Sequence, residues 1–167
     1  MHPRANAPTP FEYPFNRLLE LRDLVSEEQM RKPDMHDRGG ERCLMTIKSG
    51  NATGVTIGRA NGVFSYVRQY FNNGTHQTSK EWAILSYDKK SGAFSAPGDS
   101  GALIADALGR FGGLLTGGSG TTEDLDITYV TPVAWLLQPI KARFPHAHLH
   151  PVMAKPATST GECGGVS

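Results

Sequence analysis

A series of short apolar segments, separated by turn residues, places the strongest limit on what this chain can fold into. The segments are rich in β-branched and aromatic residues, and turn clusters such as Asn72-Asn73-Gly74-Thr75 separate them. Short strands at this spacing, with no helices between them, predict an antiparallel barrel or sandwich. The predicted strands cover residues 42–48, 54–58, 62–70, 81–87, 101–106, 110–116 and 126–132.

Two stretches outside the predicted strands have helical character. The first covers 16–31, with Asn16 as a candidate N-cap and Pro33 as its end. Its apolar residues fall on one broad face at Leu18, Leu21, Leu24 and Val25. We expect this helix to pack on its own barrel; binding to a partner is the alternative. A second helix is expected over 133–143, after the last strand.

The chain therefore divides into three expected parts. Residues 1–39 form an extended lead and an amphipathic helix, and residues 40–145 form the strand domain with its closing helix. Residues 146–167 form a disordered tail, because they are rich in glycine and polar residues. A chain of 167 residues is long enough for one domain with a real core.

The charge and composition of the chain limit the classes of partner that it is expected to bind. The net charge is +1 and the isoelectric point is about 7.8, so no nucleic-acid or membrane-surface interaction is expected. No segment has the length of a membrane span, and the first residues lack the apolar core of a signal peptide, so the localisation is intracellular by default. Cys43 and Cys163 lie at opposite ends of the domain, which argues against a disulfide framework.

No metal and no cofactor are expected. His146, His148 and His150 alternate along the chain, and alternate residues of a strand share a face. However, no cysteine or carboxylate near them completes a ligand set, so the alternation does not indicate a metal site.

The sequence Gly98-Asp99-Ser100-Gly101 is the motif that suggests chemistry. It lies in a tight loop directly before an apolar run. A serine becomes a nucleophile when a base removes its proton and when donors already in place stabilise the oxyanion. The two glycines allow the backbone conformations that such donors need. The alternative is an ordinary turn between two strands.

The residues after this motif carry a family resemblance. The strand that contains Gly113-Leu114-Leu115-Thr116-Gly117-Gly118 follows it, and then Thr128-Tyr129-Val130-Thr131-Pro132 leads into the last helix. This order resembles the C-terminal half of a chymotrypsin-like (trypsin-like) serine peptidase. It is most similar to the atypical trypsin-like proteins of fungi, plants and bacteria.

The resemblance covers about residues 40–145. It implies an all-β fold, a six-stranded antiparallel Greek-key barrel that corresponds to the second barrel of the trypsin-like fold. An N-terminal helical segment and a C-terminal helix would flank this barrel.

The resemblance also implies roles for particular residues. Ser100 takes the nucleophile position, and the backbone N–H groups of Gly98 and Ser100 would form the oxyanion hole. Thr116, Gly117 and Gly118 would line the specificity pocket and pair with the substrate backbone. Glycines on a strand leave room for another chain alongside, which agrees with this role.

Asp99 would shape the oxyanion loop through a buried ion pair. A buried carboxylate needs a partner, which in many members of the family is a freshly cleaved N-terminus. Arg59 or Arg68 is the expected substitute in this chain.

The family's catalytic histidine, and the aspartate that orients it, come from the other barrel and precede the serine. Nothing here matches the motif around that histidine. His36, between Asp34 and Asp37, is the only histidine before the barrel with carboxylate neighbours, and we interpret it as a linker residue. We expect either a fragment of a longer peptidase or a lineage that kept the second barrel alone.

Two principal functions follow. The first is a serine endopeptidase that acts through an acyl-enzyme on Ser100. This chain alone would be inactive unless a first-barrel chain supplies the histidine and the aspartate. The second is a non-catalytic lobe that binds an extended peptide or a partner protein. A third hypothesis is an unrelated β-barrel interaction domain. The expected partners are a peptide or protein substrate and a first-barrel chain or a second copy.

Overall fold

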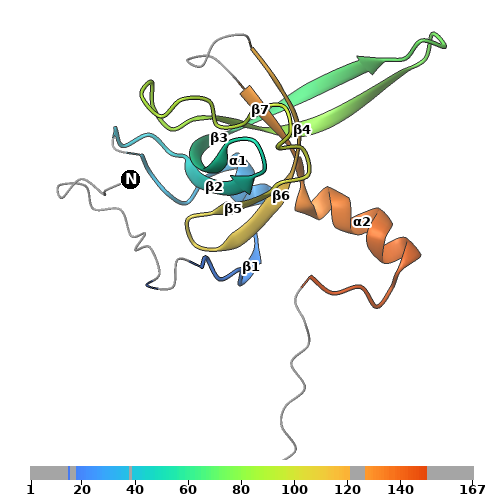
Figure 1. The fold of residues 1–167 in the computed structure, drawn as a ribbon. Helices are drawn as coiled ribbons and strands as arrows, with labels where there is room; N and C mark the ends of the chain where they lie inside the picture. The colour runs from blue at the N-terminus through green and yellow to red at the C-terminus, as the bar shows by residue number, and fades with distance from the viewer. Residues whose placement is uncertain (1–14, 16–17, 38, 121–126, 150–167) are drawn as a thin grey trace, which may run out of the picture.

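The computed structural model describes residues 15, 18–37, 39–120 and 127–149 (Figure 1). In these ranges the protein is dominated by strands, with two helices. The elements in chain order are β1 (Asp23–Leu24), α1 (Glu27–Arg31), β2 (Leu44–Gly50), β3 (Gly54–Tyr70), β4 (His76–Ser86), β5 (Leu103–Asp106), β6 (Arg110–Ser119), β7 (Ile127–Pro132) and α2 (Val133–Arg143).

The strand pairings join six strands in a cycle. The order is β6-β5-β2-β3-β4-β7, and β7 also pairs with β6; each of these pairings is antiparallel. This arrangement is consistent with the chymotrypsin-like barrel that the sequence predicts. The Greek-key connectivity remains a prediction.

The core lies inside these strands and follows from their alternation. In β2, the buried residues Leu44, Thr46 and Lys48 alternate with more exposed ones, as expected where one face of a strand is inside. The central residues are Trp82 and Ile84 of β4 with apolar side chains from the facing strands. The fully buried members of this cluster are Val25, Met30, Leu44, Ala60, Trp82, Ile84, Ile104 and Val130.

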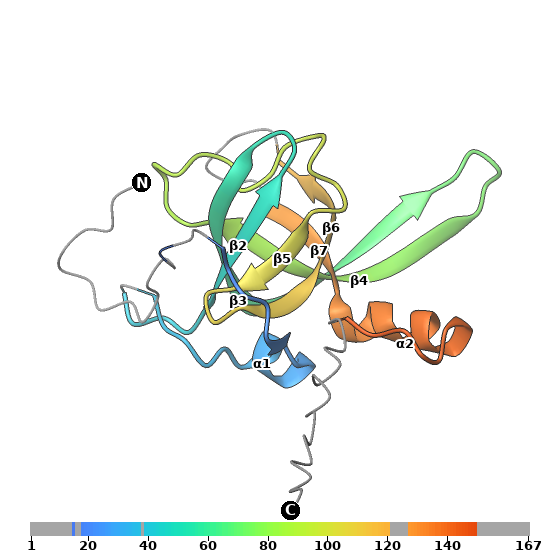
Figure 2. The same ribbon diagram turned by 60° about the horizontal axis from the view of Figure 1, so that its bottom comes forward.

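A two-stranded arm made by β3 and β4 projects from the barrel (Figures 1 and 2). The sequence predicts a break at residues 59–61, but β3 continues through it as one strand, with an irregular register between Ala60 and Phe64. Pairing with β2 ends at Ala60, and pairing with β7 begins at Trp82. From Phe64 to Tyr70 the arm strand therefore pairs only with β4 among the described residues.

The predicted helix over 16–31 is wrong in its first part. Residues 18–22 have no regular structure and β1 pairs in parallel with β6, so only α1 is helical. Asn16 lies outside the described residues. The helix begins late because Ser26 and Gln29 form a capping box, in which each side chain accepts a hydrogen bond from the other residue's backbone N–H.

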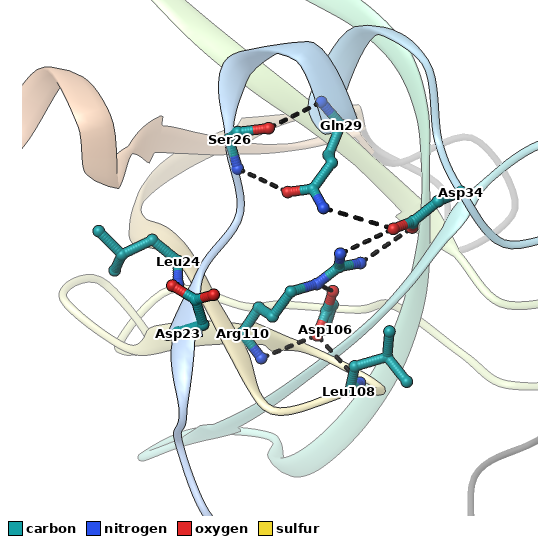
Figure 3. Close-up of polar contacts among 8 residues, drawn as sticks. All are labelled: Asp23, Leu24, Ser26, Gln29, Asp34, Asp106, Leu108 and Arg110. Atoms are coloured by element: carbon teal, nitrogen blue, oxygen red, sulfur yellow. Dashed lines mark hydrogen bonds and ion pairs between the residues drawn. The ribbon is translucent and has the colours of Figure 1, made fainter.

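This N-terminal segment belongs to the barrel domain. Val25 and Met30 lie fully buried in the core. Figure 3 shows Arg110 between two carboxylates: its guanidinium donates to Asp34 at 2.7 and 2.9 Å and to the buried Asp106. The segment therefore packs on its own barrel, as expected, and an ion-pair network fastens it there.

The C-terminal helix α2 covers the predicted range 133–143. It extends from the end of β7 on the same side of the sheet as the arm (Figures 1 and 2). Residues 150–167, most of the predicted disordered tail, lie outside the described residues.

Candidate functional site

Ser100 lies on the loop between β4 and β5, where its side chain is exposed. Gly98 has a φ of 105°, a conformation that favours glycine. The Asp99 N–H donates to the carbonyl of Ala96 at 3.0 Å, and the Gly101 N–H donates to Leu115 of β6 at 2.7 Å. The loop is therefore tied both to itself and to the strand predicted to line the substrate site.

Two N–H groups on this loop have no assigned acceptor. Within the described ranges, neither the Gly98 N–H nor the Ser100 N–H donates a hydrogen bond, while those of Asp99 and Gly101 between and after them do. Gly98 is also exposed. These are the two donors that the sequence analysis expects in an oxyanion hole.

A buried ion pair fixes the position of the Ser100 loop. The ammonium of Lys48 lies 3.1 Å from the Asp99 carboxylate, and both side chains are completely buried. The Lys48 ammonium also donates to the hydroxyl of Thr53 at 2.6 Å. The Asp99 carboxylate accepts four further hydrogen bonds, from the N–H groups of Ala52, Thr53 and Ala96 and from the Thr53 hydroxyl.

The prediction that an arginine pairs with Asp99 is wrong. Arg59 pairs with Asp37 at 2.8 Å, and Arg68 donates to Thr78 on the arm. Lys48 takes the place because it occupies an inward position of β2, directly beneath the loop. Alternation of buried positions along β2 was the available signal for Lys48.

The hydrogen bonds on Asp99 keep it ionised. Burial by itself raises the pKa of this carboxyl group. Hydrogen bonds from Thr53, Ala52, Lys48 and Ala96 outweigh burial and hold the pKa well below its ordinary value. The loop that carries Ser100 is thus fixed by an ion pair supplied entirely from this chain.

A cavity of about 260 Å³ opens beside Ser100. Gly117 and Gly118 of β6 are among the residues that line it. The hydroxyls of Ser95 and Thr128 are hydrogen-bonded to each other across it at 2.6 Å. The lining residues are Ser95, Ala96, Pro97, Ser100, Leu115, Gly117, Gly118, Ser119, Gly120, Ile127 and Thr128. None of these described lining residues carries a charge.

One edge of β6 next to this cavity has no pairing partner among the described residues. Pairing between β5 and β6 ends at Leu103 and Leu114, and the following bonds join Leu115 to the Ser100 loop. From Gly117 to Ser119, β6 pairs only with β7 among the described residues. Its other edge can accept an extended peptide, because unpaired strand edges bind added strands.

Thr116 lies apart from the Ser100 cavity. Its exposed hydroxyl is within reach of two acceptors, the Tyr129 carbonyl at 3.2 Å and the carboxylate of Glu81 at 3.4 Å. Glu81 is a buried acid on β4 that sequence reasoning missed. It sits directly before the buried Trp82, and alternation along β4 places it on the outer face.

No histidine from the described part of the chain hydrogen-bonds the Ser100 hydroxyl. His36 is exposed before β2 and makes an isolated bridge with Arg42. His76 lies at the far end of the arm against Tyr70. His146 and His148 follow α2. His150 lies outside the described residues.

The described part of the chain contains neither a cluster of metal ligands nor a membrane-spanning helix. Across the described ranges, no three histidine, cysteine, aspartate or glutamate residues cluster in a way that could hold a metal ion. No described helix has the length and apolar character needed to cross a membrane.

Comparisons with known proteins show a structural likeness but no match in sequence. No protein-family model matches the sequence, and no curated protein matches it. The crystal structure of Cellulomonas bogoriensis chymotrypsin is similar over 61% of this chain and 47% of that chain, with 25% sequence identity and a TM-score of 0.40. The chain therefore spans less than half of the length of the chymotrypsin to which it is similar.

Proposed function

We propose that this chain is the C-terminal lobe of a trypsin-like serine endopeptidase, with Ser100 as its nucleophile and a six-stranded Greek-key barrel as its scaffold. The observation that carries the proposal is the Ser100 loop itself. A completely buried Lys48–Asp99 pair holds it, and the N–H groups of Gly98 and Ser100 on either side of Asp99 have no acceptor among the described residues.

The proposed reaction proceeds through an acyl-enzyme. The Ser100 hydroxyl oxygen attacks the scissile carbonyl, and its proton passes to an imidazole supplied by a partner. The N–H groups of Gly98 and Ser100 donate to the oxyanion. The imidazole then returns the proton to the leaving amine, and water hydrolyses the ester on Ser100 by the same route in reverse.

The substrate would lie along β6. Its backbone would pair with the edge of β6 at Gly117 and Gly118, and one of its side chains would enter the cavity that Ser95 and Thr128 help to line. Thr116 begins this strand segment. Since Lys48 neutralises Asp99, ordering the Ser100 loop needs no newly cleaved N-terminus.

The test is labelling of Ser100 with a fluorophosphonate probe. Loss of one member of a catalytic triad costs on the order of 10⁴ to 10⁶ in turnover, so the isolated chain should label no faster than its Ser100→Ala variant. Addition of a polypeptide that carries the histidine-bearing first barrel should restore labelling. Rapid labelling of the isolated chain, lost in Ser100→Ala, would show instead that the base lies within this chain, and His36→Ala would be examined first.

A second candidate is a non-catalytic lobe that binds an extended peptide. The edge of β6 that is unpaired among the described residues, beside the Ser100 cavity, favours it independently of Ser100 chemistry. Labelling that stays at the level of Ser100→Ala with every first-barrel chain, together with saturable peptide binding by both variants, would select this function. A bulky residue at Gly117, as in Gly117→Val, should then block the peptide.

A further inference from the structure

A groove separate from the Ser100 cavity lies on the outer face of the barrel. It has a volume of about 530 Å³ and runs between the arm, the adjoining parts of β6 and β7, and α2. Figures 1 and 2 show the arm and α2 extending from the same side of the sheet. The lining residues that matter here are Glu81, Thr116, Gly117, Tyr129, Thr131 and Trp135.

Glu81 is the unusual residue of this groove. It is only 5% exposed, and one oxygen, Oε2, accepts a hydrogen bond from the Thr131 hydroxyl at 2.9 Å and a long one from Thr116 at 3.4 Å. Within the described ranges, no lysine, arginine or histidine forms an ion pair with Glu81. A buried carboxylate without a cation is costly, because threonine hydroxyls replace only part of its hydration.

Lys80, the one cation among the described residues that line the groove, is already engaged elsewhere. The Lys80 ammonium lies 2.7 Å from Glu27 and 4.4 Å from the centre of the Phe64 ring. Lys80 and Glu81 are consecutive on β4, so their side chains point to opposite faces of the strand. The groove therefore offers a buried negative charge to a cation from outside the described chain.

The hydrogen bonds at Glu81 favour an imidazolium over a guanidinium. Because Oε2 receives the hydroxyl donors, Oε1 is left for one N–H, whereas a guanidinium gains most from donating to both oxygens. The Trp135 side chain, 58% exposed at the rim, offers a flat apolar surface on which a ring can pack.

The groove also adjoins the nucleophile's cavity. Gly117 lines both hollows, so the groove and the Ser100 cavity meet at this β6 residue. We propose that this groove receives a histidine side chain from the partner polypeptide, with Glu81 as the acceptor for one ring N–H. The inference rests on the proposed function, since it names the partner's residue and the place where it docks.

The experiment uses the full chain, labelled with ¹⁵N, and 4-methylimidazolium chloride as the probe for the histidine side chain. Saturable shifts are expected for the amides of Glu81, Thr116 and Thr131 and for the Trp135 indole N–H. In Glu81→Gln, which keeps an acceptor for the threonine hydroxyls but loses the charge, affinity should fall about 10- to 100-fold. Glu81→Asp should keep part of the affinity, which a purely structural role for Glu81 would not explain.

Three controls define the outcome. Glu41→Gln removes an exposed carboxylate outside the groove and should bind the probe like the parent chain. The isosteric 4-methylthiazole lacks an N–H donor and should not produce these shifts. Propylguanidinium should bind more weakly than 4-methylimidazolium; tighter binding would overturn the choice of histidine.

The proposal fails if the probe gives no saturable shifts at the groove, or if Glu81→Gln binds it as tightly as the parent chain. Ser100→Ala should bind the probe unchanged, because Ser100 does not line the groove. Binding that depends on Glu81, combined with a serine that never labels in the presence of a first-barrel chain, would support the groove and refute the peptidase function. The two ideas are thereby tested separately.

Discussion

Replacement of Lys48 by methionine should destabilise the protein more than any other single loss of a cation. Methionine fills much of the same space, so the main change is the loss of the ammonium 3.1 Å from Asp99. Breaking a buried ion pair by removing one partner costs about 3–5 kcal/mol. Four other hydrogen bonds to Asp99 remain, from Ala52, Thr53 and Ala96, so we expect the lower end, about 3 kcal/mol.

Urea unfolding and calorimetry measure this loss. For a chain of this size, about 3 kcal/mol corresponds to a decrease in Tm of about 6–12 °C. Lys80→Met is the matched control: it removes an ammonium from the more exposed pair with Glu27 and should cost much less. A cycle with Asp99→Asn should give a coupling energy of at least about 1 kcal/mol between Lys48 and Asp99.

The reasoning would be refuted by a Lys48→Met protein that loses less than about 1 kcal/mol, or no more than Lys80→Met. Either result would mean that water reaches the Asp99 carboxylate and screens it. Amide shifts at Ala52 and Thr53 report the same change locally, because both N–H groups donate to Asp99.

Three further outcomes follow from the same contacts. A Cβ at Gly50 would collide with the Asp99 carboxylate and approach the Lys48 ammonium to 2.8 Å, so Gly50→Ala should lower the urea midpoint, while unchanged stability would contradict the packing. Arg110→Lys keeps the charge but cannot reproduce the paired bonds to Asp34, so calorimetry should show a loss of about 1–3 kcal/mol and no loss would argue against the network. Hydrogen bonds from Arg110 lower the pKa of Asp34, as those on Asp99 lower its pKa despite burial. The stability that these carboxylates contribute should be complete above about pH 5 and should decrease as the pH falls through 4 toward 3, measured by urea unfolding at each pH.

Much of the strand pattern could be predicted because it depends on local alternation and turn residues. The predicted segment 101–106 contains β5, and 126–132 contains β7. The early helix was misplaced because pairing with β6 overrides the helical periodicity of Leu18 to Val25. The N–H of Val25 donates to the Phe111 carbonyl at 2.9 Å, a contact between distant residues that periodicity does not encode. The pair Ser26 and Gln29 was the local signal that placed the true helix start.

The loop of Ser100 could be predicted as a loop, whereas the residues around it could not. Lys48 and Asp99 are far apart in the sequence, and their contact depends on how β2 passes beneath the loop. An arginine was the expected partner for this buried carboxylate, but Arg59 forms an ion pair with Asp37 instead. Glu81 was missed for a similar reason, since its carboxylate is buried in the tertiary fold, where its partners Thr116 of β6 and Thr131 of β7 are distant in sequence.

The arm extends the protein well beyond the barrel. Its paired region runs from Phe64 opposite Trp82 to Tyr70 opposite His76, roughly 20 Å at the rise of an antiparallel strand. A ribbon of two strands is marginally stable by itself, so its outer amides should exchange with solvent long before those of the barrel. A molecule that binds Tyr70 at the tip would therefore stiffen the whole arm, and with it the groove that runs along the arm from Gln69 to Glu81.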